Sequence, residues 1–96
     1  MKTVRLPWVS AYAYRIEVRT HNGTRYARIL LRVLANGKVH NLSEDAEFSE
    51  FGRSHGVPVE DLQGHLRELW KGGHDFPPGV LGELRAQADR LLEVTS

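Results

Sequence analysis

The chain has 96 residues, of which 41% are hydrophobic and 26% charged, and it contains no cysteine. This length predicts a single domain over residues 1–96, and the composition is that of an ordinary globular protein. No apolar run reaches the roughly 20 residues of a membrane span, and disulfides and thiolate metal sites are excluded. We therefore expect a cytoplasmic protein without a membrane partner.

The charge is divided between the two halves of the chain. Residues 1–42 carry eight Lys or Arg and one acid, a net charge of +7, whereas residues 43–96 carry five Lys or Arg and eleven acids, a net charge of −6. This predicts a basic segment 1–42 followed by an acidic segment 43–96. Such an asymmetry indicates a charged partner and carries no information on the fold.

The basic segment predicts a sheet. Thr3–Val9 is a possible edge strand with Val4, Leu6 and Trp8 on one side, although Pro7 restricts it to an edge or a bulge. Residues 11–20 alternate between apolar and polar side chains, which is typical of a half-buried strand. Asn22-Gly23 then favours a type I′ hairpin turn into a second strand at 24–35.

The register of this hairpin separates two faces. A two-residue turn pairs Val18 with Ala27 and Ile16 with Ile29 on an apolar face. A second Asn-Gly pair, at 36–37, predicts a hairpin to a third strand at 38–42, with Leu31 opposite Leu42. The other face of the sheet carries four arginines and one tyrosine: Arg15, Arg19, Arg28, Arg32 and Tyr26.

The acidic segment predicts helices. Ser43 can cap a first helix that ends near Gly56. Pro58 fits the first position of a second helix, whose apolar stripe is Val59, Leu62, Leu66, Leu69 and Trp70. Pro77-Pro78 begin a last helix, which has Leu81, Leu84, Ala88 and Leu91 on one face. The predicted fold is therefore α+β: a three-stranded antiparallel meander, with a possible fourth strand at its N-terminal edge, packed against two to three C-terminal helices.

The candidate binding site is the outer face of the sheet, which the helices would leave bare. Guanidinium groups bind phosphates bidentately, and an exposed aromatic ring can stack on a base. Arg15, Arg19, Arg28 and Arg32 would contact phosphate, Tyr26 would stack or position, and Arg25 and Lys38 would widen the positive field from opposite ends of the sheet. A solvated face is the simpler explanation of the same charges, because Glu17 neutralises part of Arg28 and arginine stems cover apolar surface.

Other features of the sequence support weaker hypotheses. Phe51–Leu69 is loosely similar to a helix-turn-helix, but Glu60-Asp61 at the start of its second helix would repel phosphates. His55, His65 and His74-Asp75 would have to meet in the fold to hold a metal for hydrolysis, and their spacing places no two on one helical face. Acids at helix starts stabilise helices without a partner, although the acidic helices would also fit a basic partner or a second copy.

Three strands followed by a helix, over residues 11–55, resemble small sheet-based DNA readers such as AP2-type domains in topology, and no functional residue is carried over from them. The sequence predicts a non-enzymatic binding module with no catalytic residue, metal or cofactor, whose partner is DNA or RNA. The alternative is a protein–protein module, such as an inhibitor, adaptor or accessory subunit of phage or mobile-element origin, for which Leu30, Leu34 and Val39 would form an apolar contact area. A homo-oligomer fits either hypothesis.

Overall fold

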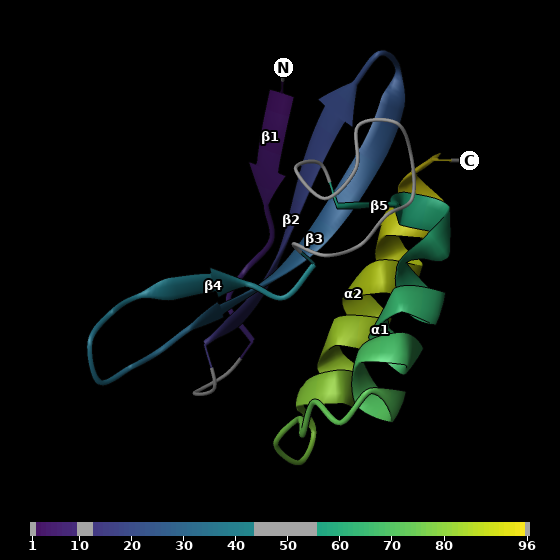
Figure 1. The fold of residues 1–96 in the computed structure, drawn as a ribbon. Coiled ribbons are helices and arrows are strands. Elements are labelled where there is room, and N and C mark those ends of the chain that lie inside the picture. The colour runs from purple at the N-terminus through teal and green to yellow at the C-terminus, as the bar shows by residue number, and fades with distance from the viewer. Residues whose placement is uncertain (1, 10–12, 44–55, 96) are drawn as a thin grey trace.

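A computed structural model describes residues 2–9, 13–43 and 56–95. An antiparallel sheet precedes two helices in the chain, which confirms the predicted α+β class (Figure 1). Four strands lie side by side in chain order, namely β1 (Lys2–Arg5), β2 (Tyr14–His21), β3 (Thr24–Arg32) and β4 (Val39–Asn41). A short strand β5 (Val57–Pro58) also pairs with β3, and it is followed by a 3-10 turn (Val59–Asp61), α1 (Leu62–Lys71) and α2 (Val80–Thr95).

The β2–β3 hairpin has the predicted register. Asn22 and Gly23 adopt φ values of 51° and 79°, as a type I′ turn requires, and Ile16 lies opposite Ile29. Both isoleucines are fully buried, and Val18 opposite Ala27 continues the same buried face. The turn and the alternating pattern therefore specify the same pairing, and this pairing determines which side chains face outward.

The predicted register of the β3–β4 hairpin is wrong by two residues. Leu31 lies opposite His40 rather than Leu42, and the backbone N–H of Leu42 donates to Ile29 O at 2.8 Å. In the Asn36-Gly37 pair only Gly37 has a positive φ, so a type I′ turn does not form, and the Gly37 N–H instead donates to Val33 O at 2.7 Å across a longer loop. Because side chains alternate with a period of two, this slip leaves the paired residues Leu30–Arg32 and Val39–Asn41 on their predicted faces, whereas Val33 and Leu34 lie outside the strands.

The predicted N-terminal edge strand Thr3–Val9 is only partly formed: β1 ends at Arg5, and after a bulge Val9 makes an isolated bridge to β2. Val4 lies opposite Val18 and Val9 bridges Tyr14, so the segment from Val4 to Val9 has one residue more than the β2 segment that it faces. The extra residue falls around Pro7, and it reverses the direction in which later side chains point. Val9 is consequently buried in the core, and Trp8 does not share a side with Val4, contrary to the prediction.

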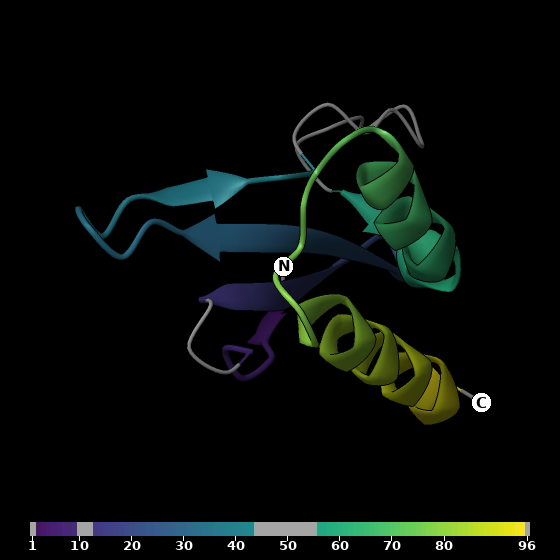
Figure 2. The ribbon, with the colours of Figure 1, turned by 90° about the horizontal axis from the view of Figure 1, so that it is seen from below.

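The helices cover the apolar face of the sheet, as predicted. Leu62 and Leu66 of α1 and Leu84 of α2 are fully buried and form one core with Ile16 and Ile29. Figure 2 shows the two helices on one side of the molecule, while the β3–β4 hairpin extends away from them. The opposite face of β2 and β3 is therefore left uncovered by α1 and α2.

The start of the helical part differs from the prediction. Val57-Pro58 pairs with Tyr26 and Ala27 of β3, so Pro58 closes a short strand and does not begin an α-helix. Gly56 fits here because its φ is 86° and a Cβ at this position would lie 2.2 Å from Ala27 O. The predicted first helix lies outside the described residues. Among the described residues, no helix is long and apolar enough to cross a membrane.

Candidate functional site

The four predicted arginines share the face of the sheet that points away from α1 and α2. In the β2–β3 register Arg15 lies opposite Leu30, Arg19 opposite Tyr26 and Arg28 opposite Glu17. Arg32 continues the same alternation on β3. Arg5 of β1 lies opposite Glu17 and joins them, so we define the arginine face as Arg5, Arg15, Arg19, Arg28 and Arg32.

Glu17 lies in the middle of the arginine face and is 3% exposed. Its Oε1 accepts hydrogen bonds from Nε and Nη2 of Arg28, the former at 2.8 Å, and its Oε2 accepts one from Nε of Arg5 at 3.2 Å. Nε of Arg19 completes the cluster as an ion pair at 3.4 Å. Burial acts to raise the pKa of Glu17, but the hydrogen bond and charge of Arg28, together with the charges of Arg19 and Arg5, outweigh it, so that this pKa lies below its usual value.

Trp8 holds the other two arginines of the face. The Cζ atoms of Arg15 and Arg32 lie over its ring, 4.3 and 4.4 Å from the centroid. Both distances are within the range of a cation–π interaction. The bulge at Pro7 makes this contact possible, because it turns Trp8 towards the arginine face. Two guanidinium groups are thus held at one ring, and they are not paired with Glu17.

The five arginines and Glu17 leave the arginine face with a formal charge of +4. Glu17 is buried, whereas the side chains of Arg5, Arg19 and Arg28 are 62%, 31% and 17% exposed. Each of these three arginine side chains is therefore more exposed than the carboxylate that they surround. This arrangement suits the binding of an anion.

The remaining predicted site residues are not all on this surface. Tyr26 lies on the arginine face but is only 5% exposed, and it pairs with Arg19 of β2 on one side and Pro58 of β5 on the other. Its ring therefore has no face open to a base in this conformation. Lys38 is exposed in the β3–β4 loop, where its backbone N–H donates to Asn36 Oδ1 at 2.9 Å.

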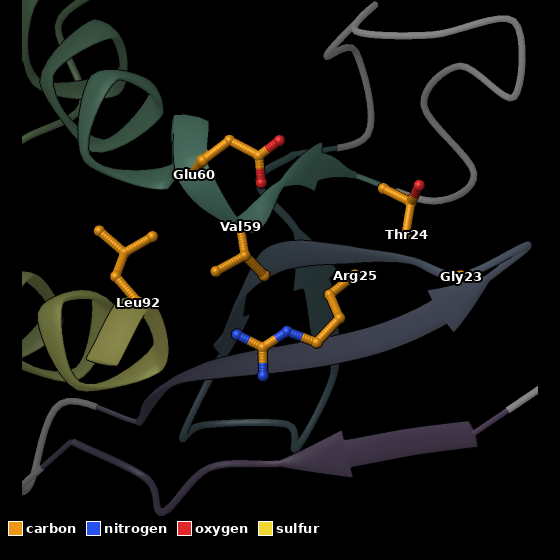
Figure 3. Close-up of a pocket in the computed structure, with 6 residues that line it drawn as sticks. All are labelled: Gly23, Thr24, Arg25, Val59, Glu60 and Leu92. Atoms are coloured by element: carbon orange, nitrogen blue, oxygen red, sulfur yellow. The ribbon is translucent and has the colours of Figure 1, made fainter. Parts of the chain in front are cut away.

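Arg25 points to the opposite side of the sheet, towards the helices (Figure 3). Its Nη2 donates to Leu91 O of α2 at 2.7 Å. It lines a pocket of about 380 Å³ with Gly23, Thr24, Val59, Glu60 and Leu92. Arg25 therefore ties β3 to α2 and lies apart from the other predicted arginines.

Two described histidines are engaged in packing contacts. Nε2 of His65 lies 2.7 Å from Ser43 Oγ, which also accepts the backbone N–H of Ile29 at 3.0 Å. Burial lowers the pKa of His65, although the charge of Glu68 opposes this shift. Nε2 of His74 lies 2.8 Å from Tyr14 Oη. His65 and His74 thus contact different partners, His55 lies outside the described residues, and no group of three metal-ligating side chains occurs among the described residues.

Sequence reasoning missed Trp8 and Arg5 as members of the site. Alternation from Val4 places Trp8 on the helix side of the sheet, and only the extra residue at Pro7 reverses it. The one available signal was Pro7 itself, since proline in a strand marks an edge or a bulge. No protein-family model matches the chain, and comparisons with curated proteins and with solved structures also give no match.

Proposed function

We propose that the protein binds nucleic acid through the arginine face, chiefly by contacts to the phosphate backbone. The observation that carries the proposal is the pair of guanidinium groups of Arg15 and Arg32 over the Trp8 ring, at 4.3 and 4.4 Å. A guanidinium can lie against an aromatic ring and still offer its N–H edge to an oxyanion. Fixing both side chains before binding reduces the entropy lost when they contact phosphate.

The aromatic residues support phosphate contacts rather than base stacking. The Trp8 ring already carries two cations, and Tyr26 is 5% exposed. Contacts to phosphate position a protein on nucleic acid but carry no sequence information. We therefore expect binding with little sequence preference and a strong dependence on salt.

Glu17 has a positioning role in this proposal. It holds Arg28 and Arg5 by hydrogen bonds and lies beneath the exposed part of the face. Arginines fixed in this way keep much of their positive field, since the face retains a formal charge of +4. Arg15 and Arg32 are the better targets for mutation, because loss of Arg28 would also leave a buried carboxylate poorly paired.

Fluorescence anisotropy with labelled duplex DNA, duplex RNA and polyglutamate tests the proposal. The variant Arg15→Gln/Arg32→Gln should bind duplexes at least about tenfold more weakly, whereas Arg90→Gln, on the exposed surface of α2, should bind like the wild type. Trp8→Ala keeps every charge but releases the two guanidiniums, so it should weaken binding less than the double variant. Equal binding by wild type and double variant, or tighter binding of polyglutamate than of duplexes, would argue against nucleic acid.

Exposed apolar side chains favour a second candidate, a protein–protein module. Leu34 in the β3–β4 loop is 67% exposed, and Val39, opposite Arg32 on β4, is 52% exposed. On the described part of the sheet, β4 pairs only with β3 and has a free edge that another strand can join. Specific capture of one protein partner in nuclease-treated extract, lost in Leu34→Ser/Val39→Thr, would favour this candidate.

A further inference from the structure

A second cationic site lies on the far side of the molecule, between α1 and α2. Its walls are Arg67, Trp70 and Lys71 from α1 and Leu81 and Arg85 from α2, around a cleft of about 160 Å³. Trp70 is 58% exposed, which is unusual for so large an apolar side chain. The sequence predicts Trp70 as part of the apolar stripe of its helix, whereas the structure leaves its side chain exposed and separate from the arginine face.

The geometry of the helices fixes this cluster. Arg67, Trp70 and Lys71 are three and four residues apart, so they lie on one side of α1. Arg85 is held in place by Gln63, whose Oε1 accepts from Arg85 Nε at 3.3 Å and whose Nε2 donates to Arg85 O at 2.9 Å. In the part of the chain that the structure describes, no carboxylate forms an ion pair with any of the three cations.

We propose that this cleft binds an acidic peptide segment of a partner protein, which inserts one apolar side chain between Trp70 and Leu81. The volume suits a single side chain and is below that of a typical small-molecule pocket. Tryptophan and arginine are the residues most enriched among binding hot spots, and the three surrounding cations match carboxylates on the peptide. This site is separate from the arginine face and goes beyond the proposed function.

Charges outside the cleft favour a peptide over nucleic acid as the occupant. Glu68, Glu83 and Asp89 are exposed on the same two helices. A nucleic acid carries a phosphate at every nucleotide, so a strand lying along these helices would meet the carboxylates as well as the cations. A peptide can place its acids only where the cations are and present neutral residues elsewhere.

The test uses the two tryptophans of the chain. In a Trp8→Phe background the emission of Trp70 alone is followed while capped glutamate-rich peptides with one central leucine are added. The matched peptide has serine in place of leucine, and oligodeoxythymidylate serves as the nucleic-acid probe. Trp70→Ala and Arg67→Glu are compared with Arg90→Glu by anisotropy of the labelled leucine peptide, with circular dichroism to confirm that each variant is folded.

We expect the leucine peptide to shift the emission of Trp70 saturably and to bind at least about tenfold more tightly than the serine peptide. Trp70→Ala and Arg67→Glu should each weaken its binding by about tenfold or more, and Arg90→Glu should not. Equal binding of both peptides, or unchanged binding in Trp70→Ala, would overturn the proposal. A shift of Trp70 emission by oligodeoxythymidylate that Arg67→Glu abolishes would overturn it as well, since the cleft would then be a nucleic-acid site.

Discussion

Replacing Glu17 with glutamine is the most informative test of how the arginine face is built. The carboxylate is 3% exposed and makes hydrogen bonds or ion pairs with Arg5, Arg19 and Arg28. The glutamine side chain would keep the volume and one acceptor oxygen but would leave three guanidiniums close together around a neutral group. The variant Glu17→Gln should therefore be less stable than the wild type at neutral pH.

The size of the effect follows from the exposure of the partners. Removing one partner of a fully buried ion pair costs about 3–5 kcal/mol, whereas exposed pairs contribute about 0–1 kcal/mol. The side chain of Arg28 is 17% exposed, but those of Arg19 and Arg5 are 31% and 62% exposed. We therefore expect Glu17→Gln to lower the free energy of unfolding by about 2–3 kcal/mol, which is less than the loss for a fully buried ion pair.

Urea denaturation at several pH values measures this loss, with Glu68→Gln on the exposed surface of α1 as the control. Because the pKa of Glu17 is lowered in the folded protein, ionised Glu17 stabilises the fold fully above about pH 4.3, the ordinary pKa of glutamate. This stabilisation is lost as the pH falls through the folded-state pKa. The difference in the free energy of unfolding between wild type and Glu17→Gln should accordingly become smaller as the pH falls below about 4.3. Equal stability of the two proteins at pH 7, or a difference that does not change with pH, would refute the reasoning.

Three further predictions concern the core and its contacts with the sheet. Gly56→Ala should cost about 2 kcal/mol or more in urea denaturation, because its Cβ would lie 2.2 Å from Ala27 O, whereas Gly23→Ala, with nothing within 4 Å, should cost only about 1 kcal/mol. Ser43→Ala removes the acceptor of a buried backbone N–H and should lower the free energy of unfolding by about 1–3 kcal/mol. Because the pKa of His65 is lowered in the folded protein, neutral His65 stabilises the fold fully above about pH 6.5, and this stabilisation is lost at lower pH. The free energy of unfolding of the wild type should therefore fall from about pH 6.5 towards pH 5. In His65→Gln, denaturation curves should show a smaller change of this free energy with pH.

The sheet could be predicted from the sequence wherever two local signals agreed. At Asn22-Gly23 the turn residues and the apolar alternation require the same pairing, and Ile16 lies opposite Ile29 as predicted. At Asn36-Gly37 the same dipeptide did not determine the register. A longer loop forms there in place of the two-residue turn, and it is closed by the hydrogen bond from the Gly37 N–H to Val33 O. The alternation pattern cannot detect a slip of two residues, because such a slip keeps each paired residue on the same face.

The candidate site was predicted in part, for a similar reason. Strand alternation placed four arginines on one face, which depends on β2 and β3 alone. Trp8 reaches that face only because of the extra residue at Pro7. Tyr26 is buried in a part of β3 that pairs with Pro58, which is distant in sequence. Tertiary contacts of this kind leave no periodic signal in the chain.

The salt dependence of duplex DNA binding tests the central claim most directly. If Arg15 and Arg32 each neutralise a phosphate, the slope of log K against log salt should be shallower by about 1.8 in Arg15→Gln/Arg32→Gln than in the wild type, and unchanged in Trp8→Ala. Identical slopes for wild type and double variant, or no measurable binding of the wild type at low salt, would contradict the account.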